Sequence, residues 1–362
     1  MLLANLENRI KKVQERLNKE NLDGFLVTRF ENKRYLTNFS GSTSWVIVTQ
    51  SKCLILVDGR YTVQAEEESP SLIERVQISD YLDGFPKELP SVLHQLKIKR
   101  LGIEAHQMTL LESRRIEEEA GGIILVSTTG WIEGLRIKKT EDEIQKLKAA
   151  ISTAEEAYQK GIEAVQSGVE EIMIAHEILS FLSQKGLKTA FDTIAASGER
   201  SAMPHGRPTN RKIQMGDIVV IDMGAVWEGY YSDITRTVCL GKPSDEAKNI
   251  FALLQKAQEA AYKAIRPGVI AKDVDWAARK VIQDAGFGDY FSHGLGHGIG
   301  LEVHEAPSIR KTGDQVLEAG MVITVEPGVY IPGKFGMRLE DDVLVTESGC
   351  QVLTSLPHIL EI

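Results

Sequence analysis

Residues 216–224 read GDIVVIDMG, and residues 320–328 read GMVITVEPG. Both stretches are short apolar runs, which predict buried β-strands, and both place a carboxylate two residues before a glycine at the end of the run. A buried carboxylate is costly unless it is paired or holds a metal ion. The two stretches therefore indicate two related halves of one domain, each contributing an acid to a common site.

The segments before these strands also repeat, one hundred positions apart. A helix that ends in a glycine-containing turn is predicted in each half, and the matching positions are Ala157, Ala164, Val165, Gly168 and Val169 in the first and Ala257, Ala264, Ile265, Gly268 and Val269 in the second. Solenoid repeats are much shorter, at about 20–50 residues. The offset therefore favours an internal pseudo-twofold within one domain.

A second acid follows in each half, again beside an apolar strand. Asp233 lies in YYSDIT at 230–235, and Glu340 lies in MRLEDDVL at 337–344. A single aspartate at a strand end usually caps a turn, but four acids in one setting need a counter-charge. An oxygen-rich site with one imidazole suits Mn²⁺, Co²⁺ or Zn²⁺, and bridging carboxylates suit two ions about 3.5–4 Å apart.

Three of the eight histidines fall in the glycine-rich stretch HGLGHGIGLEVHE at 293–305. Alternating glycines leave the backbone open, so His293, His297 and His304 can approach one centre. A phosphate-binding loop is the rival interpretation, but neither GxGxxG nor GxxxxGK[ST] spacing is present. The histidines interpreted as ordinary polar residues are His94, His106, His176 and His358.

The first 126 residues show strands alternating with helices. Apolar runs predict strands, and amphipathic spacing predicts helices over 6–20 and 110–120. The predicted strands are 24–28, 45–49, 53–57, 99–103 and 122–126. This pattern predicts a small α/β domain over 1–126, followed by an α+β domain over 127–362. A capping box, Thr140 with Glu143, predicts the start of a long helix in the second domain.

Composition excludes several classes of protein. Hydrophobic residues make up 43% of the 362 and charged residues 26%, which argues against disorder and coiled coil. A net charge of −9 argues against a broad nucleic-acid-binding face. The three cysteines have no CxxC spacing, and no apolar run reaches the ~18 residues of a membrane span. We therefore expect a cytoplasmic protein that binds neither nucleic acid nor membrane.

Together these motifs resemble those of the Xaa-Pro peptidases, prolidase and aminopeptidase P, over nearly the whole chain. The stretches that carry the resemblance are 197–205, the strand ending at Asp222, 232–237, 293–304, 325–330 and 338–342. Residues 34–42 and 58–61 resemble the creatinase-type N-terminal domain. The resemblance implies an α/β creatinase-type domain followed by an α+β catalytic domain of the pita-bread fold with an internal pseudo-twofold.

The resemblance also implies a ligand set for two divalent metal ions. The implied ligands are Asp222, Asp233, His297, Glu326 and Glu340, and all five are intact. Mn²⁺ is expected, although Co²⁺ and Zn²⁺ accept a similar set. A water shared by the ions would ionise near neutral pH and attack the scissile carbonyl.

Further roles follow from the same resemblance. Glu326 is expected to move the proton from the water to the leaving imino nitrogen, with His293 and His304 near the tetrahedral intermediate. His205 is expected at the substrate. Arg338, two residues before the last ligand on a predicted strand, would share its face and either orient a ligand carboxylate or bind substrate. A surface salt bridge is the other interpretation of Arg338.

The implied substrate is a short proline-containing peptide, and the implied assembly is a homodimer. Arg310, six residues after His304, is available as an anchor for a substrate carboxylate, but the sequence leaves its direction open. Two other functions also stay open: hydrolysis of a non-peptide ester at the same site, and a metal-free binding protein of this fold.

Overall fold

The computed structural model describes residues 2–82 and 84–362. It divides the chain into two compact units, of which the first ends at Arg136 and the second spans Ile137–Ile362. Each unit has its own buried apolar core. Among the described residues, none of the helices is both long and apolar enough to cross a membrane.

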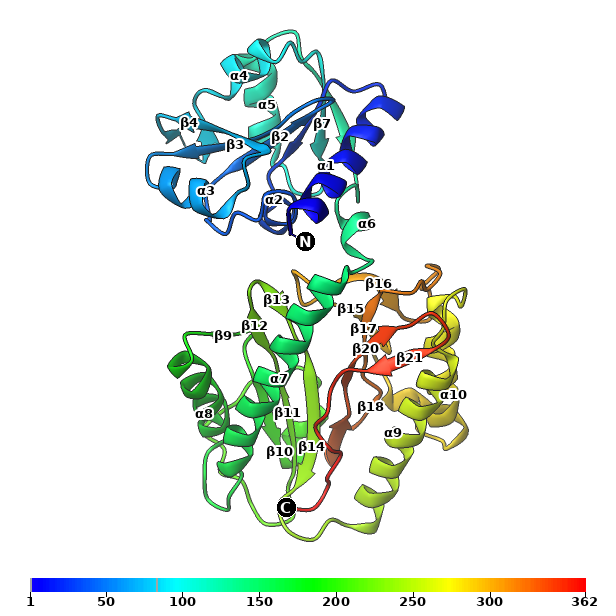
Figure 1. Cartoon of the computed structure of the whole chain (residues 1–362). Helices are drawn as coiled ribbons and strands as arrows, with labels where there is room; N and C mark the ends of the chain where they lie inside the picture. Colours follow the sequence, from blue (N-terminus) through cyan, green and yellow to red (C-terminus); the bar gives the residue numbers. More distant parts are fainter. Residues whose placement is uncertain (1, 83) are drawn as a thin grey trace. The chain divides into compact units, whose positions relative to one another are not determined.

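A six-stranded sheet forms the centre of the first unit (Figure 1). Its order is β4–β3–β2–β1–β7–β8, with bounds Ile73–Ile78, Cys53–Asp58, Trp45–Thr49, Gly24–Val27, Arg100–Glu104 and Ile124–Thr128. β1, β7 and β8 run parallel, while β2 is antiparallel to both of its neighbours. Every residue of β1, β2 and β3 is buried, as expected for strands covered on both faces.

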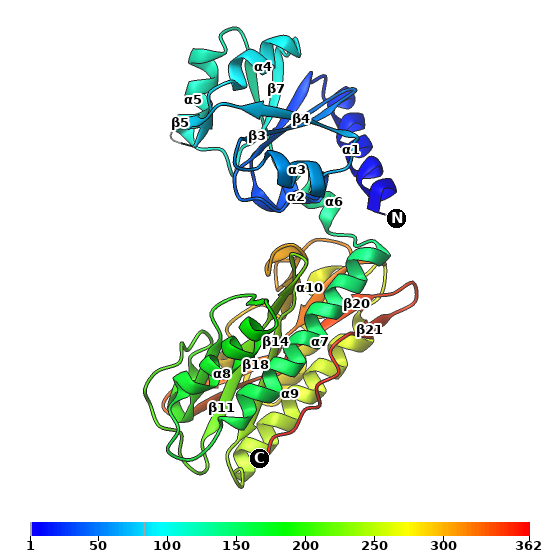
Figure 2. The same ribbon diagram turned by 60° about the vertical axis from the view of Figure 1, so that its left-hand side comes forward.

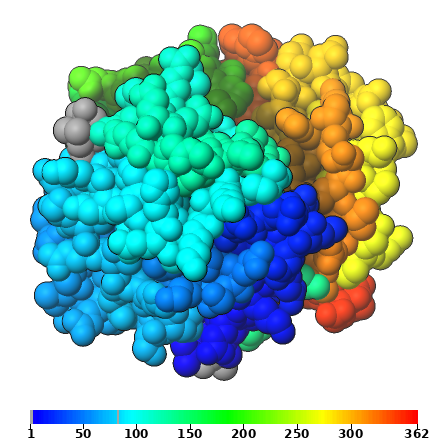
Figure 3. Space-filling model, turned by 90° about the horizontal axis from the view of Figure 1, so that it is seen from above, coloured from blue at the N-terminus to red at the C-terminus, as the bar shows by residue number. Residues whose placement is uncertain are grey.

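In the described part of this unit, six helices accompany the sheet and complete the predicted α/β architecture, which is confirmed. They are α1 (Leu2–Lys19), α2 (Phe30–Thr37), α3 (Thr62–Glu68), α4 (Leu89–Gln95), α5 (Leu110–Glu119) and α6 (Glu133–Arg136). β5 (Tyr81–Leu82) pairs antiparallel with β6 (Phe85–Pro86). α1, at the blue end of the colour scale, lies on the surface of this unit (Figure 3). The sequence pattern does not predict α2, α3 and α4, because helices of seven or eight residues show little periodicity.

The first unit extends to Arg136, beyond residue 126, where the sequence pattern places the domain boundary. β8 runs past that residue, and the ring of Trp131 lies 4.8 Å from the ring of Phe25. Arg136 hydrogen-bonds to α2 through its guanidinium. These contacts attach residues 127–136 to the first unit, while the extent of the independently folding domains stays a prediction.

The second unit consists of two similar halves, so the predicted pseudo-twofold is confirmed. In the first half, α7 (Glu141–Glu163) and α8 (Glu171–Gln184) cover the sheet β10–β11–β14 (Ile194–Ser197, Ile218–Met223, Ile234–Cys239). In the second, α9 (Asp245–Ala264) and α10 (Ala271–Asp284) cover the sheet β16–β15–β17–β20–β21 (Glu305–Ile309, Gly296–Gly298, Val322–Val325, Asp341–Val345, Cys350–Val352). In both halves the helices lie outside the strands (Figures 1 and 2).

Short elements complete the second unit. They are β9 (Lys188–Thr189), β12 (Ala225–Trp227), β13 (Tyr230–Tyr231), β18 (Gly328–Ile331), β19 (Phe335–Arg338) and the 3₁₀ turns η1 (Gly198–Ala202) and η2 (Gly288–Tyr290). The predicted capping box begins α7, since Thr140 and Glu143 exchange hydrogen bonds between side chain and backbone. A Cβ on Gly296 or Gly298 would lie 2.1 Å from a carbonyl oxygen of β17 or β16, respectively. The glycines of β15 therefore permit close strand packing.

Candidate metal centre

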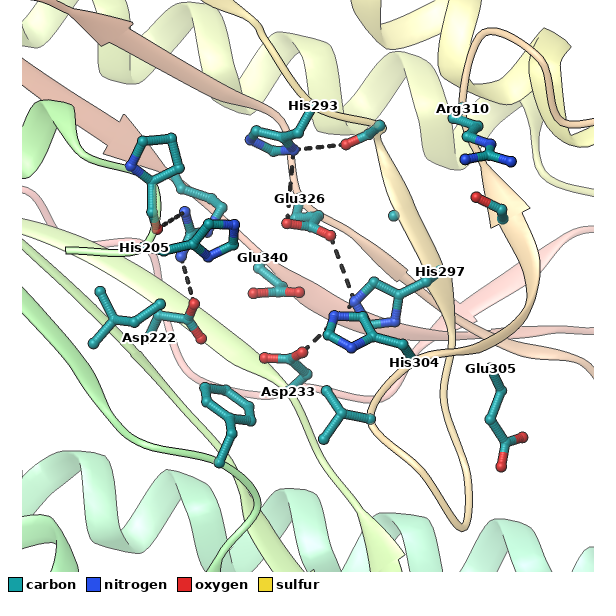
Figure 4. Close-up of a pocket in the computed structure, with 18 of the residues that line it drawn as sticks. His205, Asp222, Asp233, His293, His297, His304, Glu305, Arg310, Glu326 and Glu340 are labelled. Carbon is teal, nitrogen blue, oxygen red and sulfur yellow. Dashed lines mark hydrogen bonds and ion pairs between the residues drawn. The ribbon is translucent and has the colours of Figure 1, made fainter. Parts of the chain in front are cut away.

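A cavity of about 770 Å³ is lined by residues from both halves of the second unit. It contains all nine residues that the sequence analysis assigned to the site: His205, Asp222, Asp233, His293, His297, His304, Glu326, Arg338 and Glu340. The carboxylates of Asp222, Asp233, Glu326 and Glu340 lie with the labelled imidazoles around a common centre (Figure 4). Their convergence agrees with the sequence analysis, while their individual roles stay predictions.

Backbone pairing places the four acids. Asp222 lies on β11 opposite Thr235 of β14, and Asp233 directly precedes β14. Glu326 follows the last residue of β17, and Glu340 occupies the gap between β19 and β20. The backbone N–H of Glu340 donates to the carbonyl of Thr235 at 3.1 Å, so the two halves are joined by a hydrogen bond beside the acids.

Burial and neighbouring charges hold protons on three of these acids, Asp233, Glu326 and Glu340, in the absence of a cation. Burial, followed by the charges of Glu340 and Asp222, raises the pKa of Asp233 well above its usual range. Burial, followed by the charge of Asp222, raises the pKa of Glu340 to about 8. Burial, followed by the charge of Glu340, also raises the pKa of Glu326. The charge of a bound cation would oppose these shifts, because it favours the ionised carboxylates.

His297 is oriented as a ligand for a cation. Its Nδ1 lies 3.1 Å from a backbone carbonyl, which can only accept, so the proton belongs on Nδ1 and the lone pair on Nε2. Nε2 lies 3.7 Å from Oδ2 of Asp233 and 3.6 Å from Oε1 of Glu326. Burial lowers the pKa of His297 to about 4, so the ring is neutral near pH 7. Metal-ligating histidines commonly have this arrangement.

The remaining donor atoms also fit a divalent cation. One atom each from Asp233, His297 and Glu340 lie within 4.8 Å of one another. Over the described part of the chain, Oδ1 of Asp222 and Oδ1 of Asp233 are buried without a hydrogen-bond partner. Unpaired buried oxygens are costly unless a cation approaches them. Carboxylate oxygens with one imidazole form the donor set that Mn²⁺, Co²⁺ and Zn²⁺ accept.

Arg338 contacts residues of both halves of the second unit beside the four acids. Its guanidinium forms an ion pair with Asp222 and donates to the hydroxyls of Thr235 at 3.0 Å and Tyr330 at 2.7 Å. The hydroxyl of Thr235 in turn donates to Oε2 of Glu340 at 2.7 Å. Only 3% of Arg338 is exposed, which excludes a surface salt bridge. The ion pair of Arg338 therefore reaches a carboxylate of the other half, while its role in orienting that carboxylate stays a prediction.

Two further histidines lie against the acid cluster, which consists of Asp222, Asp233, Glu326 and Glu340. His293 donates from Nδ1 to a backbone carbonyl at 2.7 Å, so its Nε2 accepts from the hydroxyl of Tyr330 at 3.0 Å. The same Nδ1 lies 3.9 Å from Oε2 of Glu326. The ring of His304 lies 4.4 Å from the ring of His297, edge to face. The hydroxyl of Tyr330 thus joins His293 to Arg338.

The cavity wall also contains residues to which the sequence analysis assigns no role. They are Phe191, Asp192, Ile194, Pro204, Arg207, Val303, Glu305 and Ser308. These positions belong to loops and strand ends, where neither periodicity nor motif spacing distinguishes a wall residue from a surface residue. Arg310 also lines the wall and is exposed, and within residues 2–82 and 84–362 no carboxylate pairs with it.

Known protein families match nearly the whole chain. Residues 145–347 match metallopeptidase family M24, and residues 9–138 match the creatinase/prolidase N-terminal domain. The chain is 36% identical to the Xaa-Pro dipeptidase of Pyrococcus horikoshii over 351 residues, which cover 96% of this chain and 97% of that protein.

Solved structures of similar proteins share the fold. The Xaa-Pro dipeptidase from Bacillus anthracis is 36% identical, with a TM-score of 0.94 over 99% of this chain and 100% of that one. The X-Pro aminopeptidase from Thermotoga maritima is 39% identical, with a TM-score of 0.88 over 96% of this chain and 100% of that one. The predicted combination of a creatinase-type domain and a pita-bread domain is confirmed. The chain belongs to metallopeptidase family M24, and its second unit is the pita-bread catalytic domain of a metallopeptidase.

Proposed function

We propose that this protein hydrolyses the Xaa-Pro bond at the N-terminus of short peptides and uses two divalent ions, with Mn²⁺ preferred. Those ions would be held by Asp222, Asp233, His297, Glu326 and Glu340. The observation that carries the proposal is that these five side chains line one cavity, with two buried carboxylate oxygens left without a partner. The printed names of the relatives from Pyrococcus, Bacillus and Thermotoga support the substrate class.

When bound, the ions would supply Lewis acidity and hydroxide at neutral pH. Glu326 would take the proton of the attacking water and pass it to the proline nitrogen, which must be protonated to leave. His293, with Nδ1 at 3.9 Å from Glu326, would stabilise that acid while its charge changes. His304 would donate to the developing oxyanion, and His205 would contact the substrate from the facing wall.

Removal of the metal tests this proposal directly. Asp233→Asn should abolish cleavage of Ala-Pro and lower the metal content measured by elemental analysis, with an unchanged circular dichroism spectrum. Asp284→Asn, at an exposed position on α10, is the control and should keep both activity and metal. Full activity after exhaustive EDTA treatment, with no metal detectable, would contradict the proposal.

We further propose a preference for dipeptides, because Arg310 offers an unpaired cation on the cavity wall. Relatives named as dipeptidase and as aminopeptidase are about equally similar, so identity does not separate the two. Arg310→Ala should raise KM for Ala-Pro at least tenfold while changing KM for the amide of Ala-Pro little. Lys311→Ala is the adjacent control. Faster cleavage of Ala-Pro-Ala than of Ala-Pro by the unmodified protein would contradict the preference.

Two further assays separate the other functions that the sequence left open. A metal-free binding protein would show no tight Mn²⁺ site by titration calorimetry, whereas an ester hydrolase would cleave a phosphate ester and leave Ala-Pro intact. The homodimer and the cytoplasmic location stay predictions, and light scattering would test the first of them.

A further inference from the structure

Helix α10 carries two charged side chains that are almost completely buried. Asp275 and Arg279 have 1% and 4% of their surface exposed. They form a double hydrogen-bonded ion pair one helical turn apart, with Nε and Nη2 of Arg279 each 2.8 Å from an oxygen of Asp275. A buried ion pair is often no more stabilising than apolar residues of the same volume. Stability alone is therefore a weak explanation for this pair.

Both members of the pair also hold the segment that carries His293. Arg279 donates from Nη1 to the carbonyl of Phe291 at 2.9 Å and from Nη2 to the carbonyl of His293 at 2.7 Å. Its guanidinium lies 4.0 Å from the ring centroid of Phe291. Oδ1 of Asp275 accepts from the backbone N–H of Leu295 at 3.1 Å. The chain is thus held before, at and after His293.

His293 depends on this support more than Glu326 does. It lies between η2 and β15, outside any strand, so no ladder of hydrogen bonds fixes its backbone. Glu326, in contrast, follows β17, which pairs with β15 on one side and with β20 on the other. The ion pair therefore supplies to His293 the support that a sheet supplies to Glu326.

We propose that Asp275 and Arg279 are positioning residues, which fix the imidazole of His293 beside Glu326 and Tyr330. Neither side chain lines the cavity, so both act through the backbone of residues 291–295. The catalytic part of this inference rests on the proposed function. A displacement of about 1 Å at a reacting group can lower the rate by about a hundredfold, which sets the scale of the effect.

The test compares Asp275→Asn and Arg279→Lys with Asp284→Asn, which breaks an exposed ion pair on the same helix. The two buried changes should lower kcat/KM for Ala-Pro by about 10–100-fold with unchanged metal content, and the control should change nothing. In a His293→Ala background, Asp275→Asn should lower kcat/KM by less than about threefold, because the positioned group is already absent. Equal losses in both backgrounds would overturn the proposal.

A second readout uses the metal-free protein labelled with ¹⁵N-histidine. The ring signals of His293 are identified by their absence in His293→Ala, and they should shift in Asp275→Asn and Arg279→Lys but not in Asp284→Asn. Unchanged signals in folded variants, or loss of folding in both buried variants, would overturn the positioning role. If the unmodified protein fails to cleave Ala-Pro, the proposed function fails, while this measurement still decides whether the pair positions His293.

Discussion

The affinity of the acid cluster for Mn²⁺ should keep rising with pH beyond the range in which histidine titrates. Burial and the charge of Asp222 raise the pKa of Glu340 to about 8, and burial with neighbouring charges raises the pKa of Asp233 and of Glu326. A carboxylate must be deprotonated to hold a metal ion. The metal-free cluster therefore holds protons near pH 7 that the metal-bound cluster has lost, so binding becomes tighter as pH rises.

Glu340 alone sets the minimum magnitude, because Asp233 and Glu326 would release further protons. A carboxyl with a pKa of about 8 is protonated in about nine of ten molecules at pH 7, so Glu340 contributes a release of about 0.9 proton there. Between pH 6 and pH 7 this contribution raises the affinity about tenfold, or about 1.4 kcal/mol, and it should level off above pH 8. His297 adds nothing in this interval, because burial lowers its pKa to about 4 and the ring stays neutral.

Titration calorimetry with Mn²⁺ measures both quantities. Binding enthalpies at pH 6, 7 and 8, each in two buffers of different ionisation enthalpy, give the number of protons released. Glu340→Gln should reduce the release at pH 7 by about 0.9 proton. The reasoning fails if binding at pH 7 releases no proton, or if the affinity stops rising near pH 6.5, where an ordinary histidine would account for it.

Three other changes have defined outcomes. Glu171→Gln removes a buried carboxylate that accepts hydrogen bonds from both ends of the segment carrying His205, so steady-state kinetics should show KM raised about tenfold. Arg236→Met breaks a fully buried pair with Asp341, and urea unfolding should show the free energy of unfolding lowered by about 3–5 kcal/mol. Tyr330→Phe removes the hydroxyl that joins Arg338 to His293, so kcat should fall with the metal content retained.

The sequence could predict the positions of the four acids because the strand patterns determine them. An apolar run that ends in an acid places that acid near the end of a strand, as for Asp222 next to the last residue of β11 and Glu326 directly after β17. A one-hundred-residue repeat then predicts that the halves face each other. The convergence of the side chains in one cavity agrees with this reasoning.

The contacts between the two halves of the second unit could not be predicted from the sequence. Arg338 was expected to share a strand face with Glu340, but β19 ends at Arg338, and its ion pair is with Asp222 of the other half. The spacing of Asp275 and Arg279 is also found in exposed helical pairs, and nothing in the sequence distinguishes a buried pair from a solvated one. Burial depends on what packs over a helix, which a single helix cannot specify.

The repeat also explains why each half supplies two acids to the site, whereas the imidazole of His297 comes from the second half and has no counterpart on the matching strand of the first. Each half ends its strands in carboxylates, because a duplicated sheet repeats its strand ends. An imidazole at the centre needs close backbone approach instead, and the strand that carries His297 achieves it with Gly296 and Gly298, where any side chain would collide with a neighbouring carbonyl. The corresponding β10 places Ile194 opposite Asp222 and supplies no ligand atom. Chemistry that distinguishes the two sides of a peptide bond therefore depends on the segments in which the halves differ.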